Sequence, residues 1–120
     1  MAGVVHIPWY ATGFRGDQLE AALAEIAPIA LRYGGTSYSV YRSRDDRYKF
    51  LQTAGFESKM DWERYWSGPE FIDFRVETSS WYQVPVLYSW TDLVISGDMH
   101  GNGNGNGNAA PAPEEAVEAG

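Results

Sequence analysis

The chain has 120 residues, the length of one domain, with 44% hydrophobic and 15% aromatic residues and a net charge of −7. It contains no cysteine, which excludes disulfides, thiolate catalysis and cysteine-ligated metal centres. The acidic balance argues against nucleic-acid binding. The absence of cysteine makes a reduced cytoplasm the expected compartment. No segment approaches the ~20 apolar residues that span a bilayer, so we expect no membrane contact.

Two elements are predicted in the first third of the chain. Residues 4–10 alternate in character and predict a strand, with Val5, Ile7 and Trp9 on one face and His6 on the other. A helix capped by Gly16 or Asp17 is predicted next, because apolar residues recur at helical spacing from 19 to 33. We expect a kink at Pro28 and an end at the following glycine pair.

The middle of the chain predicts a hairpin and a second helix. Residues 36–43 and 48–56 alternate as strands joined by a charged turn. Ser58 begins a capping-box pattern, and the helical stretch that follows runs to about residue 79. We expect a break at Ser67-Gly68-Pro69, where the proline suits the first turn of a new helical segment.

Residues 81–95 are predicted as the last strand, and both of its faces carry apolar side chains. A sheet covered by helices on one side should show a polar second face. The chain has no element left to cover such a face, so a second copy of the sheet is the simplest cover. Pro85 cannot donate to a ladder and predicts an edge position or a bulge.

We place the domain boundary near residue 97. Residues 98–120 form a Gly/Asn-rich and then Ala/Pro/Glu-rich tail that cannot bury enough apolar surface to order itself. This tail is predicted to be disordered. It has two readings, a solubilising extension or a tether to a larger protein complex.

Three segments resemble the dimeric α+β barrel superfamily, and especially its antibiotic-biosynthesis-monooxygenase group. They are residues 14–20 (FRGDQLE), residues 35–46 (GTSYSVYRSRDD) and residues 50–66. The resemblance implies an α+β, ferredoxin-like β-α-β-β-α-β domain that forms a homodimer. Members of the group often carry histidines in the helix after the third strand. This chain reads Tyr65-Trp66-Ser-Gly-Pro-Glu70 there, which weakens the case for oxygenase or haem-degrading activity.

Aromatic residues suggest a ligand pocket. Trp62 and Trp66 lie one helical turn apart and flank Tyr65. With Tyr38 and Trp90 they are candidate walls of a pocket for a flat aromatic or quinone-type molecule. The alternative is packing in the core.

Two residues are candidates for catalysis. His6 is the one histidine of the predicted domain and could act as a general base, or it could simply be hydrogen-bonded. Arg42 could hold an oxyanion or carboxylate, or form an ion pair at a dimer interface. A single histidine makes a protein metal site improbable.

The leading functional hypothesis is a cofactor-independent monooxygenase acting on an aromatic or quinone-type small molecule. In it the protein supplies a dry pocket, orientation and a proton acceptor. The alternative is a non-catalytic dimeric binding or assembly subunit of a larger complex, with the tail as its tether.

Overall fold

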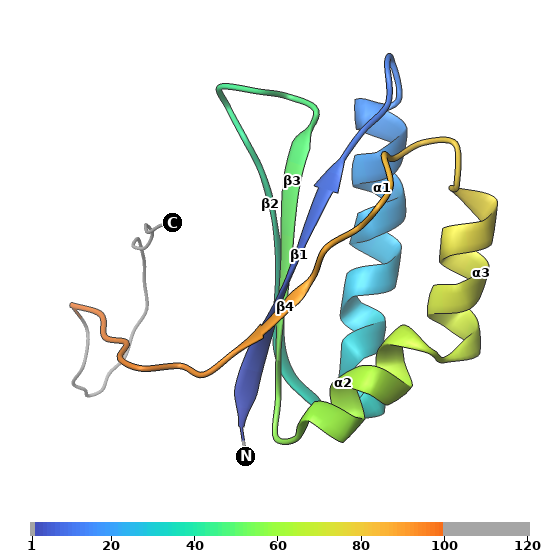
Figure 1. Cartoon of the computed structure of the whole chain (residues 1–120). Coiled ribbons are helices and arrows are strands. Elements are labelled where there is room, and N and C mark those ends of the chain that lie inside the picture. The colour runs from blue at the N-terminus through green and yellow to red at the C-terminus, as the bar shows by residue number, and fades with distance from the viewer. Residues whose placement is uncertain (1, 100–120) are drawn as a thin grey trace.

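A computed structural model describes residues 2–99, and the elements follow the order β-α-β-β-α-β (Figure 1). Each predicted helix is divided into two segments. The elements are β1 (Gly3–Tyr10), α1 (Gly16–Ile26), the 3-10 helix η1 (Ala27–Tyr33), β2 (Gly35–Arg42), β3 (Lys49–Phe56), α2 (Lys59–Trp66), α3 (Pro69–Glu77) and β4 (Ser89–Thr91).

The strands form one antiparallel sheet in the order β2-β3-β1-β4. Val5, Ile7 and Trp9 are buried, whereas the residues between them are half-buried or exposed, as the alternation in the sequence predicted. The register places Ile7 opposite Gln52 and Trp9 opposite Phe50, so each pair shares a face. All the helices lie on this face, and the other face of the sheet is open (Figure 1).

The first helical stretch changes its geometry at the predicted position. α1 ends at Ile26, and η1 begins with Pro28 in its first turn, where a missing N–H costs little. Gly34 ends the segment with φ 90°, in the left-handed region that glycine enters without steric cost.

The second helical stretch also follows its predicted signals. The Ser58 side chain accepts a hydrogen bond from the Asp61 N–H at 3.2 Å, which caps α2. The carboxylate of Asp61 forms an ion pair with Arg64 at 3.2 Å. The break comes between Trp66 and Pro69, and Pro69 opens α3.

The hydrophobic core fills the space between the sheet and the helices. Its largest fully buried side chains are Trp9, Trp62, Tyr65, Phe56, Phe71, Ile7, Leu19, Leu23, Gln52 and Val5. The indole of Trp9 is central, with ring centroids 4.9 Å from Tyr82, 5.5 Å from Phe74 and 6.2 Å from Phe71. These ring contacts pack β1 against α3 and against the segment that follows α3.

The prediction of a long last strand is wrong. Only Ser89–Thr91 pairs in a ladder, and before it an isolated bridge joins Tyr82 to Ala11. Pro85 lies between these two points, where its missing N–H prevents a continuous ladder. The predicted edge position holds, since β4 is the outer neighbour of β1.

The ferredoxin-like α+β fold is therefore confirmed. Most of the predicted tail lies outside the residues that the structure describes, so the domain boundary near residue 97 stays a prediction. No helix within residues 2–99 is both long and apolar enough to cross a membrane.

Candidate functional site

A large hollow lies on the open face of the sheet. Its volume is about 1410 Å³, and its floor is made by β1 and β3 with Val4, His6, Pro8, Leu51 and Thr53. Residues 91–95, from the last residue of β4 onward, form a second wall, and residues 83–85 and 87 contribute along the same edge. Small-molecule pockets usually measure roughly 300–1,000 Å³, so this hollow has room for more than one small ligand.

His6 lies in the middle of the floor. It is half-buried on β1, directly between Thr53 of β3 and Ser89 of β4. The two neighbours on its own strand that share its face are Val4 and Pro8. A titratable imidazole among small hydroxyl and apolar side chains can accept a proton from a ligand that rests on this face.

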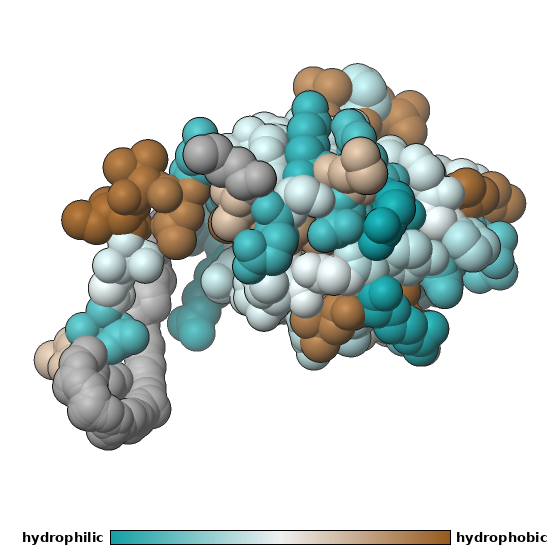
Figure 2. Space-filling model, turned by 90° about the horizontal axis from the view of Figure 1, so that it is seen from below, coloured by the Kyte–Doolittle hydropathy of each residue, from teal (hydrophilic) through white to brown (hydrophobic). Residues whose placement is uncertain are grey.

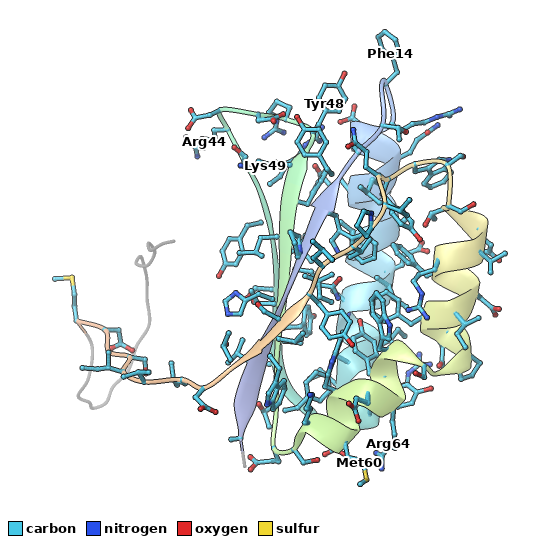
Figure 3. All side chains as sticks on the ribbon, in the orientation of Figure 1. Phe14, Arg44, Tyr48, Lys49, Met60 and Arg64 are labelled. Carbon is cyan, nitrogen blue, oxygen red and sulfur yellow. The ribbon has the colours of Figure 1, made fainter. Side chains whose placement is uncertain are left out.

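A polar cluster stands at the end of the hollow next to the β2–β3 turn. Figure 3 labels Tyr48 and Lys49 there, close to Arg44. The Tyr10 hydroxyl donates to Asp46 at 2.6 Å. This hydrogen bond and a second one from the Tyr48 N–H both lower the pKa of the Asp46 carboxyl. The hydrogen bond to Asp46 also raises the pKa of the Tyr10 hydroxyl. The charged Asp46 carboxylate therefore links the β2–β3 turn to Tyr10 at the end of β1.

Arg42 has its guanidinium on the helix side of the sheet. Nη1 donates to Asp17 and to Glu20 of α1, both at 2.8 Å, and Nε donates to the Arg47 carbonyl oxygen at 2.7 Å. The guanidinium also lies 5.0 Å above the Phe50 ring. The two carboxylates raise the pKa of Arg42, and together these contacts join the end of β2 to the start of α1.

The two candidate catalytic residues both border the hollow, but their side chains have different surroundings. His6 faces the open side, and the Arg42 guanidinium is bound to α1 on the opposite side of the sheet. The role of Arg42 in binding an oxyanion stays a prediction. In the structure its guanidinium is paired with the carboxylates of Asp17 and Glu20.

The aromatic candidates are brought together in part. Trp62 and Tyr65 are fully buried, with ring centroids 6.1 Å apart, and Trp62 lies 5.4 Å from the half-buried Trp66. The half-buried Trp90 faces the same side from β4, whereas Tyr38 is 41% exposed on the edge strand β2. These positions resemble core packing more than the walls of an open pocket. Their role in ligand binding remains a prediction.

A buried series of hydrogen bonds, which no pattern in the sequence predicted, crosses the core. The Trp9 Nε1–H donates to Gln52 Oε1 at 3.0 Å, and Gln52 Nε2 donates to the Tyr65 hydroxyl at 3.2 Å. That hydroxyl donates in turn to the Ile26 carbonyl oxygen at 2.6 Å. Burial raises the pKa of Tyr65, so its hydroxyl remains a neutral donor.

The hollow itself was also missed, although one signal was present. The alternation in 4–10 and 48–56 places His6, Leu51 and Thr53 on the face opposite the core. The aromatic residues of the second helix instead predicted a pocket on the helix side of the sheet. Across residues 2–99 no group of three or more His, Asp or Glu side chains is arranged to hold a metal ion.

No protein family model matches the chain, and no curated protein matches it in sequence. Solved structures match its fold. A candidate antibiotic biosynthesis monooxygenase of Nitrosomonas europaea has a TM-score of 0.71 at 13% identity, over 78% of this chain and 90% of the other. A candidate monooxygenase of the same kind from Chloroflexus aurantiacus gives 0.68 at 20% identity, over 82% and 98%.

A third match is a variant of SnoaB, a cofactor-independent oxygenase from Streptomyces nogalater. Its TM-score is 0.68 at 14% identity, over 79% of this chain and 95% of SnoaB. The chain therefore shares the fold of the antibiotic-biosynthesis-monooxygenase structures, as the resemblance in its sequence predicted. At these identities the likeness concerns the fold alone.

Proposed function

We propose that this chain works as a homodimer that binds an aromatic or quinone-type small molecule in the hollow on its open sheet face. We propose further that it acts on this molecule as a cofactor-independent oxygenase. The observation that carries the proposal is the hollow, which is mostly apolar and holds His6 on its floor. An apolar site with few polar groups suits a flat aromatic ligand.

The proposed reaction needs only an apolar site and one proton acceptor from the protein. A substrate CH₂ group activated by neighbouring carbonyl or phenol groups loses a proton to His6, and the carbanion gives its electrons to O₂. A C–O bond forms and the O–O bond then breaks. The CH₂ becomes C=O, and the second oxygen atom leaves as water with the two hydrogens. The apolar surroundings keep bulk water from the carbanion.

The test measures oxygen uptake with anthrone as the substrate, with His6→Gln compared with the unchanged chain. General-base catalysis contributes typically 10²–10⁴-fold, so we expect a loss of that order. His100→Gln is the matched control because His100 is the other histidine of the chain, and it should keep the full rate. Equal rates for the two variants would refute the role of His6.

One observation favours a second candidate, a non-catalytic dimeric binding or assembly subunit. The Arg42 guanidinium is already bound by Asp17 and Glu20, and the aromatic candidates Trp62 and Tyr65 are fully buried. Equilibrium dialysis with 1,4-naphthoquinone separates the two functions. Binding without oxygen uptake from anthrone or a naphthohydroquinone between pH 6 and pH 9 would support the subunit and exclude the oxygenase.

A further inference from the structure

A groove about 380 Å³ in volume lies between α1, η1 and α3, on the helix side of the sheet. Its apolar lining comes from Ile26 and Ile29 and from Phe74 and Trp81. We call it the helix groove. Its volume lies at the lower end of the roughly 300–1,000 Å³ of small-molecule pockets, so it has room for one large apolar side chain.

Carboxylates stand around the helix groove. Glu25, Asp73 and Glu77 line it, are exposed, and form no ion pair within residues 2–99. A fourth, Glu70, accepts a hydrogen bond from Tyr33. Like charges around one groove repel one another, and no three of the described carboxylates are arranged to hold a metal ion. The groove therefore suits an apolar group that carries organic cations beside it.

A surface of the opposite character lies at one end of the molecule. The loop between β1 and α1 (residues 11–15) and the turn between β2 and β3 (residues 43–48) lie together there, and the Ala11 N–H donates to the Tyr48 carbonyl oxygen at 2.8 Å. Figure 3 shows Phe14 projecting beyond them. We call these two segments, with the adjoining Lys49, the loop end.

Phe14 makes no contact that explains its position. It is 97% exposed, and its ring touches no other ring or cation within residues 2–99. Its φ of 64° lies in the left-handed region that suits glycine. Side chains other than glycine that are held in this region occur at binding sites. The phenyl ring is therefore a candidate anchor for a surface outside its own chain.

Unpaired cations accompany this ring. Arg15, Arg44, Arg47 and Lys49 are exposed, and none of them pairs with a carboxylate within residues 2–99. Of the carboxylates at this end, only that of Asp45 lacks a partner among the described residues, because the others bind an arginine or a tyrosine of the same end. Unpaired cations thus outnumber unpaired carboxylates four to one.

The loop end and the helix groove therefore match in two respects. An aromatic side chain seated in a pocket and surrounded by arginines is a typical hot spot of a protein interface. A free organic cation would neutralise the carboxylates of the groove but leave Phe14 exposed. A second copy of the chain covers both surfaces with one contact, which identifies it as the occupant.

The other exposed apolar segment does not fit the groove. Figure 2 shows hydrophobic side chains gathered on the part of the chain that projects after β4, apart from the body of the molecule. Leu93, Val94 and Ile95 are strongly exposed there. Residues 92–98 contain two aspartates and no Lys or Arg. The carboxylates around the helix groove would repel this segment, whereas they attract the loop end.

We propose that copies of this chain associate by placing the loop end of one in the helix groove of the next. Phe14 enters the groove, and the guanidinium groups of Arg44 and Arg47 pair with the carboxylates of Asp73 and Glu77. The open sheet face takes no part, so the inference does not rest on the proposed function. One copy of each pair keeps a free groove and the other a free loop end, so the contact repeats from head to tail.

The first test reverses the charges of one surface at a time in the full chain. One variant carries Arg44→Glu and Arg47→Glu, and the other carries Asp73→Lys and Glu77→Lys; all four side chains are exposed. Sedimentation velocity from 10 μM to 1 mM should show the mass of the unchanged chain rising with concentration. Neither variant should show this rise, because like charges then meet in the contact.

An equimolar mixture of the two variants supplies the control. Each loop end then finds a groove of opposite charge on the other variant, so the rise in mass should return. The first variant makes the net charge of the chain more negative and the second makes it less negative. A loss in both variants that is reversed in the mixture therefore cannot come from net charge.

The second test removes the anchor. Phe14→Ala should raise the dissociation constant of the contact about tenfold or more, because the phenyl ring no longer leaves water. Met60→Ala is the matched control, since Met60 is apolar, 66% exposed, and lies on α2 at the opposite end of the molecule (Figure 3). It should leave the constant unchanged. Both side chains are exposed, so both variants should melt like the unchanged chain.

A mass that stays constant up to 1 mM overturns the proposal, and so does a mixture that fails to associate. Titration calorimetry with spermidine tests the other occupant. Spermidine binding that the Asp73→Lys and Glu77→Lys variant loses, in a chain that does not associate, would assign the groove to a small cation. A homodimer through the sheet face sets only the starting mass. Its failure, or a lack of oxygen uptake, leaves the inference standing.

Discussion

Two fully buried tryptophans differ in what their indole N–H groups meet. Trp9 donates to Gln52, and through Gln52 and Tyr65 the chain of hydrogen bonds reaches the backbone of α1. The Trp62 Nε1 is buried and has no hydrogen-bond partner among the described residues. A buried polar group without a partner costs stability that a bonded one does not. The two indoles are thus equally buried, but among the described residues only the Trp9 N–H has a hydrogen-bond partner.

This difference predicts unequal costs for the same substitution. Both Trp9→Phe and Trp62→Phe remove a similar volume from the core, but Trp9→Phe also leaves Gln52 Oε1 without its donor. We expect Trp9→Phe to be the more destabilising by roughly 1–2 kcal/mol. Urea unfolding at one protein concentration gives both values. An equal cost, or a larger cost for Trp62→Phe, would contradict the assigned network.

At the scale of elements, the sequence predicted best where a local signal decided the structure. Pro28, Gly34 and Pro69 each act on their own backbone, and each break lies where the sequence placed it. The extent of the last strand depends instead on pairing with a neighbouring strand. Alternating apolar residues from 82 to 90 favour an extended chain, but a ladder also needs a neighbour and a continuous series of N–H donors. Pro85 interrupts the donors, so the segment remains extended without being a strand.

The candidate site was predicted less well for a related reason. Local alternation correctly assigned His6 and the Arg42 face. Whether a set of aromatic side chains fills a core or lines a pocket depends on how closely the helices approach the sheet. That distance follows from all the core side chains together, and no single spacing in the sequence encodes it.

A hydrogen bond between η1 and α3 makes the packing of these helices depend on pH. The Tyr33 hydroxyl donates to Glu70 at 2.5 Å, and this bond lowers the pKa of the Glu70 carboxyl; Arg32, at 3.8 Å, lowers it further. A carboxyl whose pKa is lower in the folded state stabilises the fold above its unfolded pKa, about 4.3. This contribution disappears as the pH falls through the folded value.

Tyr33→Phe should therefore lower the melting temperature at pH 7, and the difference from the unchanged chain should shrink as the pH falls below about 4. The control is Tyr38→Phe, because Tyr38 is an exposed tyrosine whose hydroxyl bonds to nothing within residues 2–99. Melting curves at pH 7, 5, 4 and 3 test this. A deficit for Tyr33→Phe that stays constant at all four pH values would assign the loss to packing.

At the scale of the whole molecule, the helices cover one face of the sheet, and the other face is open within the part of the chain that the structure describes (Figure 1). A second copy was expected to cover this face because a long last strand would carry apolar residues on both of its faces. The reason needs correction, since most of that segment is not a strand. Val84 and Leu87 are nevertheless strongly exposed and line the hollow, and the exposed Leu93, Val94 and Ile95 beyond β4 add to the same apolar surface.

A homodimer that forms through this surface predicts that thermal stability depends on concentration. Unfolding then separates two chains as well as melting them, so a higher protein concentration favours the folded dimer. For two domains of this size the entropy of unfolding implies a rise of about 3–4 °C in melting temperature for each tenfold increase in concentration. Scanning calorimetry from 2 to 200 μM measures the slope directly. A melting temperature independent of concentration in the full chain, at concentrations near its measured dissociation constant, would mean that the open sheet face has some other occupant.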